Sequence, residues 1–153
     1  IVSLVEVARS ALRDVRTLAH REPAVSLASE LHRGADMLSA VGIDTRVEGH
    51  VEPLPPKIDE LFAWAVREGI TNVVRHSTAT TCSISIARRY GTVSLEIEND
   101  GAALPSGAGH GLKGLVARAA ELSGRASGQS VTGGRFVLNV EVPEGAGSAV
   151  TAT

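Results

Sequence analysis

Three polar side chains of one predicted helix, Glu68, Asn72 and His76, are spaced four residues apart. Residues at this spacing project from the same edge of an α-helix. A carboxylate, an amide and an imidazole in a row can hold a hydrated divalent cation and the phosphates that it bridges. A solvated polar stripe on an amphipathic helix has the same pattern, so the trio needs support from other parts of the chain.

Two further segments contain residue types that suit nucleotide binding. Asp100-Gly101 directly follows a predicted strand. A carboxylate there can accept a hydrogen bond from an exocyclic amine, although Asp-Gly after a strand is also an ordinary turn. The segment Gly109-His110-Gly111-Leu112-Lys113-Gly114 begins a predicted helix, where glycines let backbone N–H groups approach phosphates. A glycine-rich loop alone is weak evidence.

In this order and spacing, the three segments resemble the N box, G1 box and G2 box of the GHKL ATP-binding superfamily. Residues 67–76 look like the N box of the sensor histidine kinases that pair with NarL-type response regulators, including the DesK-like subgroup. Residues 109–112 are similar to the G2 box of that subgroup, and the whole resemblance extends over residues 4–143. It implies a Bergerat-type ATP-binding domain that uses ATP and Mg²⁺ and transfers the γ-phosphoryl group to a histidine.

The resemblance also implies a role for each matching residue. Asn72 would coordinate Mg²⁺, and Glu68 would hold a Mg²⁺-bound water or act as a base. Arg75 and His76 would contact phosphates, and Asp100 would bind the adenine amine. The remaining matches would bind the nucleotide and shape a lid over it: Gly101, Gly109, His110, Gly111, Leu112 and Gly114.

The sequence departs from the family pattern at two places in the site. Ala102-Ala103 stands where the G1 box usually continues with a second glycine, so the lid geometry is expected to differ. Thr132, beside Gly133-Gly134, is out of register with a threonine that related domains often have near the adenine. Lys113 is expected to be solvated.

No histidine stands where the family's phosphoacceptor would be. Residues 1–22 resemble the end of the second dimerisation helix, whereas the acceptor belongs on the first. Glu30-Leu31-His32 superficially resembles the acceptor motif, but it lies between that second helix and the first strand, so His32 is expected on the surface. The implied partners are therefore a dimerisation domain that carries the acceptor, in a homodimer, and a response regulator.

Hydrophobic periodicity predicts the elements that position these residues. Helices are expected over residues 1–20, 26–42, 57–76 and 112–122, and strands over residues 43–48, 81–87, 92–98, 125–130 and 135–142. Residues 99–111 are expected to be a mobile loop and 144–153 a disordered tail. This order predicts a two-layer α/β (α+β) sandwich over residues 26–143, in which three helices cover one face of a mixed, mostly antiparallel sheet.

Composition excludes several classes of protein. The 153 residues, 43% of them hydrophobic, can bury one core. The formal charge of −2 argues against a nucleic-acid partner. The single cysteine, Cys82, excludes a disulfide framework and fits a reducing, cytoplasmic setting. No apolar run approaches the roughly 20 residues that span a bilayer, so no membrane contact is expected from this segment.

Three other functions stay open at this point. An anti-sigma-factor serine kinase of the same superfamily shares the N-box pattern, although the predicted helix over residues 1–20 argues against it. A non-catalytic nucleotide-binding interaction module would fit the altered residue Ala103, whereas Glu68 and Asn72 argue for a competent kinase. A globular domain without nucleotide would require the three boxes to occur together by chance.

Overall fold

The computed structural model describes residues 25–49, 53–102 and 110–147. The elements in chain order are α2 (Leu27–Ala40), β1 (Asp44–Glu48), α3 (Pro56–His76), β2 (Thr81–Arg89), β3 (Thr92–Asn99), α4 (His110–Glu121), β4 (Arg125–Val131), β5 (Arg135–Pro143) and a 3₁₀ turn, η1 (Glu144–Gly147). The predicted helix over residues 1–20 lies outside the described residues. None of the described helices is long and apolar enough to cross a membrane.

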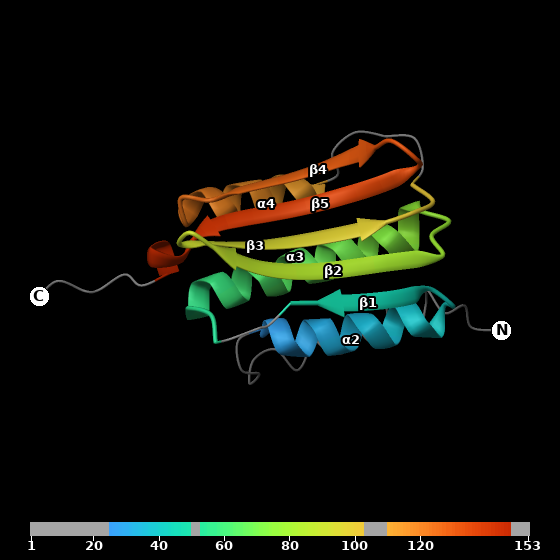
Figure 1. Ribbon diagram of the computed structural model, residues 1–153, viewed down its shortest axis with the longest axis horizontal. Helices are drawn as coiled ribbons and strands as arrows, with labels where there is room; N and C mark the ends of the chain where they lie inside the picture. The colour runs from blue at the N-terminus through green and yellow to red at the C-terminus, as the bar shows by residue number, and fades with distance from the viewer. Residues whose placement is uncertain (1–24, 50–52, 103–109, 148–153) are drawn as a thin grey trace, which may run out of the picture.

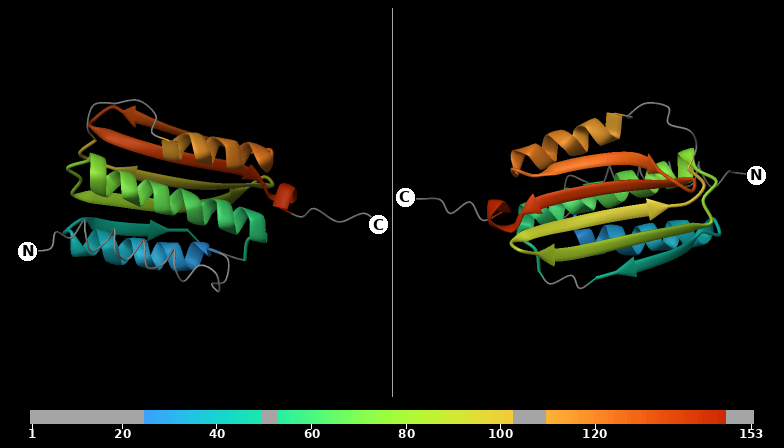
Figure 2. Two further views of the ribbon diagram at one scale, coloured as in Figure 1. Left: turned by 180° about the vertical axis from the view of Figure 1, so that it is seen from behind. Right: turned by 45° about the horizontal axis from the view of Figure 1, so that its top comes forward.

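The five described strands form one sheet in the order β1-β2-β3-β5-β4. β1 pairs with β2 in parallel, and the other three pairings are antiparallel. Figure 1 shows the open face of this sheet, and the view from behind in Figure 2 shows α2, α3 and α4 side by side on the other face. The predicted two-layer sandwich with a mixed, mostly antiparallel sheet and three covering helices is confirmed.

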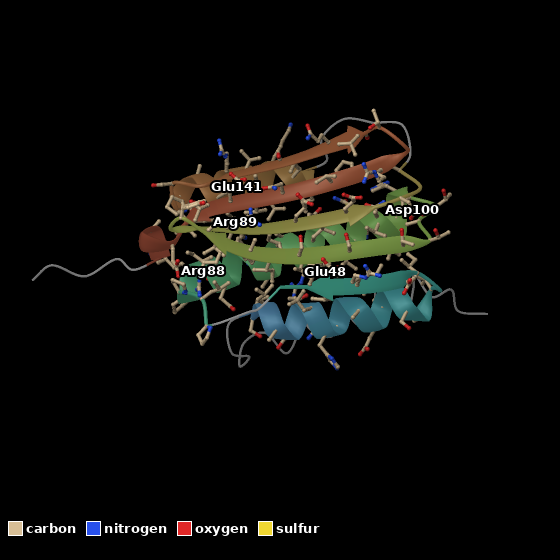
Figure 3. All side chains as sticks on the ribbon, in the orientation of Figure 1. Glu48, Arg88, Arg89, Asp100 and Glu141 are labelled. Carbon is tan, nitrogen blue, oxygen red and sulfur yellow. The ribbon has the colours of Figure 1, made fainter. Side chains whose placement is uncertain are left out.

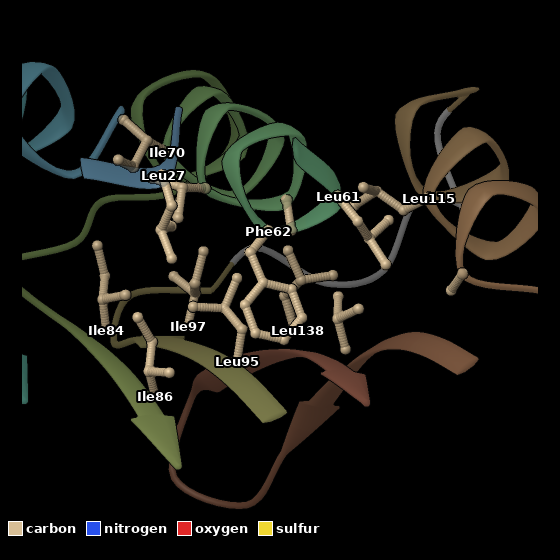
Figure 4. Packing of buried hydrophobic residues seen from close by; sticks show 14 of the residues in the cluster. Leu27, Leu61, Phe62, Ile70, Ile84, Ile86, Leu95, Ile97, Leu115 and Leu138 are labelled. Carbon is tan, nitrogen blue, oxygen red and sulfur yellow. The ribbon is translucent and has the colours of Figure 1, made fainter. Parts of the chain in front are cut away.

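The hydrophobic core lies between the sheet and the helices. Alternate residues of β3, among them Leu95 and Ile97, are buried beneath α3, which contributes Phe62 and Ile70 (Figure 4). Each buried side chain of this size stabilises the fold by about 1.5 to 3 kcal/mol. Gly69 faces the sheet, where an added Cβ would lie 2.6 Å from Ile97 Cδ1. The cost of glycine within a helix is therefore offset by a close approach of α3 to β3.

A polar cluster on the helices joins α2, α3 and α4. The carboxylate of Glu30, only 6% exposed, pairs with the Arg67 guanidinium at 2.6 Å. Arg67 and Arg118 both lie over the ring of Trp64, at 4.9 and 4.6 Å from its centroid. Because the Glu30 and Arg67 pair is largely removed from water, losing one partner would leave the other charge poorly solvated.

Two predicted irregular segments are shorter than expected. Both ends of the loop predicted over residues 99–111 belong to regular elements, because Asn99 pairs with Phe136 in the sheet and α4 already begins at His110. The predicted disordered tail was wrong for its first four residues, which form η1. Glu144 is held there because its backbone N–H donates to Gly91 O at 2.8 Å and its carboxylate lies 3.0 Å from Arg88. Residues 103–109 and 148–153 lie outside the described residues.

Candidate functional site

Three segments meet at one end of the sheet: the C-terminal end of α3 with the residues that follow it, the residues after β3, and the turn between β4 and β5 (Figures 1 and 2). Backbone hydrogen bonds join them, from Thr78 N to Gly101 O at 3.0 Å and from Ala102 N to Gly134 O at 2.9 Å. They border an open cleft of about 800 Å³. Its lining residues are Arg75, His76, Ser77, Thr78, Asp100, Gly101, Ala102, Gly133 and Gly134.

Gly101 is required by the way the cleft is built. Its φ of 63° lies in the left-handed region, and an added Cβ would be 2.6 Å from the carbonyl carbon and oxygen of Thr78. The predicted position of Gly101 in the site therefore has a steric reason, since a larger residue would push the chain away from the end of α3.

Arg75 and His76, both predicted to contact phosphates, are exposed in the last turn of α3 and line the cleft. No described residue forms an ion pair or a side-chain hydrogen bond with either of them. Basic residues in this turn also interact favourably with the helix dipole. Their N–H groups remain available to an anion in the cleft.

Glu68 and Asn72 lie further back along α3, half-buried and outside the lining of that cleft. Glu68 faces the start of α4, where a Cβ on Gly111 would overlap its carboxyl group. No described residue forms a hydrogen bond or ion pair with the side chain of either Glu68 or Asn72. One turn of α3 thus presents oxygen atoms with open lone pairs, which suits Mg²⁺, a cation that takes few protein ligands and keeps several waters.

Among the described residues, no group of three or more His, Cys, Asp and Glu side chains is placed to hold a metal ion by itself. A cation at Glu68 and Asn72 would need ligands from water and phosphate as well.

Asp100 lies beyond the end of β3, where Figure 3 labels it. Its carboxylate accepts hydrogen bonds from Thr80 N at 2.8 Å, Thr80 Oγ1 at 2.5 Å and Thr81 N at 2.9 Å. These bonds, that of the Thr80 hydroxyl first, lower the pKa of Asp100 from 3.8 to about 2. The carboxylate borders the cleft, but most of its acceptor capacity is used within the protein.

Asn99 is a candidate residue that the sequence analysis missed. The residue is 5% exposed, and its side chain continues the inward row of Leu95 and Ile97 on the helix-covered face of the sheet. Its Nδ2 donates to the carbonyl oxygen of Asp100 at 2.8 Å, and no described residue donates to its Oδ1. The alternation along β3 was the available signal, because it puts residue 99 inside and residue 100 outside.

The remaining predicted residues fall on α4 or outside the described chain. His110 and Gly111 begin α4, and Leu112 packs against the core. Gly114 is exposed, with open space where a Cβ would stand, and Lys113 is exposed as predicted. Gly109 lies outside the described residues.

Two other predictions concern residues at a distance from α4. The side chain of His32 is 85% exposed on α2, 3.6 Å from the Asp36 carboxylate, as expected for a surface histidine. Thr132 is exposed in the turn between β4 and β5, where Gly133 and Gly134 line the cleft and Thr132 does not.

No protein-family model matches this sequence. It is 32% identical over 114 residues to the sensor histidine kinase YvfT and 32% identical over 142 residues to the sensor histidine kinase LnrJ, both from Bacillus subtilis. These alignments cover 72% and 88% of the chain but 31% and 36% of the relatives. The sensor histidine kinase DesK from the same organism is 29% identical over 124 residues, which are 76% of the chain and 33% of DesK. The chain thus spans about a third of the length of these relatives.

Solved histidine kinases share the fold. The histidine kinase AdeS of Acinetobacter baumannii superposes with a TM-score of 0.62 at 18% identity, over 92% of this chain and 80% of AdeS. The histidine kinase domain of a blue-light activated kinase from Erythrobacter litoralis gives 0.63 at 16% identity, over 81% of this chain and 65% of that domain. The nucleotide-free catalytic domain of the histidine kinase ThkA superposes with a TM-score of 0.58 at 16% identity, over 78% of this chain and 94% of the ThkA domain.

Proposed function

The chain belongs to the sensor histidine kinases and has the fold of their ATP-binding catalytic domain, and from this premise we propose that it binds ATP with Mg²⁺ and transfers the γ-phosphoryl group to a histidine. The acceptor histidine belongs to a dimerisation domain of the parent protein, in a homodimer. A response regulator then receives the phosphoryl group on an aspartate. The domain works in the cytoplasm, where ATP is available.

The observation that carries this proposal is a polar edge of α3 whose side chains have no partner among the described residues. Glu68 and Asn72 are half-buried, one turn apart, and make no hydrogen bond with a described residue. Their oxygen atoms are only partly shielded from water and keep acceptor capacity that a hydrated cation can use. Arg75 and His76 continue the same side of the helix into the cleft and supply positive charge and N–H donors.

In the proposed reaction, the bond from the γ-phosphorus to the bridging oxygen of ADP breaks as a bond to an imidazole nitrogen of the acceptor forms. Mg²⁺, when bound, spreads the charge of the phosphates. Asn72 is its protein ligand, and Arg75 and His76 donate hydrogen bonds to phosphate oxygens. Glu68 either holds a Mg²⁺-bound water or takes the proton that the imidazole loses. The protein therefore contributes position and electrostatics.

The base is proposed to bind at the end of β3. Asp100 is the residue that the family resemblance assigns to the adenine amine, but three hydrogen bonds from Thr80 and Thr81 already occupy its carboxylate. The Oδ1 of Asn99, on the inner face of the sheet, accepts from no described residue, and the Nδ2 bond to the Asp100 carbonyl fixes the orientation of the amide. The geometry therefore favours Asn99 as the acceptor for the amine, with Asp100 as the residue that holds the turn.

Calorimetric titration with ATP, in Mg²⁺ and in EDTA, tests this proposal. Mg²⁺ should strengthen binding to the wild-type chain, and Asn72→Ala should remove that enhancement while the far-ultraviolet circular dichroism stays unchanged. Label from γ-labelled ATP should then appear on a separately supplied dimerisation domain that carries the acceptor histidine. A folded chain that binds no ATP would refute the function, and equal Mg²⁺ enhancement in both proteins would refute the metal site on α3.

A further inference from the structure

Two glycines of the first turns of α4, Gly111 and Gly114, stand in different surroundings. A Cβ added to Gly114 would meet nothing within 4 Å. A Cβ added to Gly111 would overlap Oε1 and Cδ of Glu68 and lie 2.7 Å from its Cγ. A side chain at residue 111 would therefore displace the end of Glu68, whereas one at residue 114 would displace nothing.

The overlap involves the whole carboxyl group of Glu68. If it involved a single oxygen, rotation of the terminal torsion would relieve it at little cost, because that torsion is broad. With Cδ and Cγ also too close, the side chain must leave its present rotamer. A methyl group on Gly111 would therefore move the carboxylate away from the edge of α3 that it shares with Asn72.

Electrostatics favours the observed place of this carboxylate. Glu68 lies beside the first turn of α4, where the backbone N–H groups have no partner within the helix and form the positive end of the helix dipole. No described cation pairs with Glu68. Its position is therefore set by the space over Gly111 together with the field of α4.

We infer that Gly111 is a positioning residue, whose missing side chain makes the slot that holds the Glu68 carboxylate in place for phosphoryl transfer. The catalytic consequence rests on the proposed function, whereas the steric coupling of Gly111 to Glu68 does not. Gly111 would thus affect the reaction through Glu68 and not only through its own backbone.

A double-mutant cycle without nucleotide tests the coupling. Gly111→Ala should lower the urea midpoint of unfolding while Glu68 is present, because the methyl group displaces a half-buried side chain. In a Glu68→Ala background the same substitution should leave the midpoint unchanged or raise it, because alanine is the better helix former and the φ of Gly111 is not positive. Gly114→Ala is the matched control and should have the same sign in both backgrounds. An equal loss from Gly111→Ala in both backgrounds would overturn the inference.

The catalytic consequence is measured with the supplied acceptor domain. Gly111→Ala should lower kcat by about tenfold or more and change KM for ATP much less, as expected when a group that acts in the transition state is displaced. In the Glu68→Ala background Gly111→Ala should lower kcat no further, and Glu68→Asp, whose side chain is one methylene shorter, should partly restore the Gly111→Ala variant. An undiminished effect without Glu68 would show that Gly111 acts alone. If the wild type transfers no phosphoryl group, the proposed function fails, but the unfolding cycle still decides the coupling.

Discussion

The base preference of the site should depend on Asn99. The residue is 5% exposed, its Nδ2 donates to the Asp100 carbonyl at 2.8 Å, and its Oδ1 has no donor among the described residues. An exocyclic amine that donates to Oδ1 gains one buried hydrogen bond. Inosine triphosphate carries a carbonyl oxygen in place of that amine, so two acceptors, this oxygen and Asn99 Oδ1, would face each other without a proton between them.

The size of the effect follows from the burial of Asn99. A buried acceptor left without a donor costs about 1 to 3 kcal/mol, which corresponds to roughly a 5- to 150-fold difference in Kd. The wild type should therefore prefer ATP to inosine triphosphate by a factor in this range. Asn99→Ala should reduce the ratio of the two dissociation constants to about one, because neither nucleotide then meets an acceptor at this position.

Calorimetry with both nucleotides gives that ratio, and Asp100→Asn is the matched control. It keeps an acceptor for the N–H groups of Thr80 and Thr81, so we expect the preference for ATP to survive in this variant. The reasoning is refuted if Asp100→Asn abolishes the preference and Asn99→Ala preserves it. That outcome would make Asp100 the acceptor of the adenine amine, as the family resemblance implies.

Three further variants test the surroundings of the site. The pKa of Asp100 is lowered from 3.8 to about 2, so the ionised carboxylate contributes its full stability above pH 3.8 and loses it as the pH falls through about 2. The free energy of unfolding of Asp100→Asn should therefore depend less on pH across this window than that of the wild type. Arg67→Ala should lower the free energy of unfolding in urea by about 3 kcal/mol, because the Glu30 carboxylate stays behind at 6% exposure, and Arg67→Ala with Glu30→Ala should be less destabilised than Arg67→Ala alone. His32→Ala should leave label transfer to a supplied acceptor domain unchanged, since His32 is a surface residue of α2; label that appears on the isolated chain and disappears in this variant would contradict that assignment.

The sequence was sufficient for the layers of the fold, since periodicity alone separates its helices from its strands. The helix over α3 was predicted to within one residue, because its apolar spacing is long. It begins one residue earlier than predicted, at Pro56, since proline suits a first helical position. Errors fell at the ends of elements. Asn99 and His110 were assigned to a loop because asparagine, aspartate and glycine favour turns, but pairing with β5 and packing of α4 decided the boundaries.

The candidate site was predictable as a set of segments and less so as a set of contacts. Spacing along α3 correctly puts Glu68 and Asn72 on one edge, because a helix fixes that relation locally. Which side chain at the end of β3 keeps a free acceptor depends on Thr80 and Thr81, which are distant in sequence and bind Asp100. Likewise, no local pattern separates Gly111 from Gly114, since only the packing of α4 against α3 puts Glu68 beside one of them.

The helix α3 connects the core to the candidate site, and this explains how the site can be held in place while several of its polar atoms have no partner among the described residues. One face of the helix is anchored by Phe62 and Ile70, and Gly69 brings it against Ile97 of β3. The next residue before Gly69 is Glu68, and two residues beyond Ile97 is Asn99. The same close contact therefore fixes the positions of the side-chain oxygens of Glu68 and Asn72 on the helix edge and of the Asn99 amide oxygen at the end of the strand. Because core packing sets the distance between the helix edge and the end of β3, a ligand that contacts both does not have to order them, and binding costs less conformational entropy.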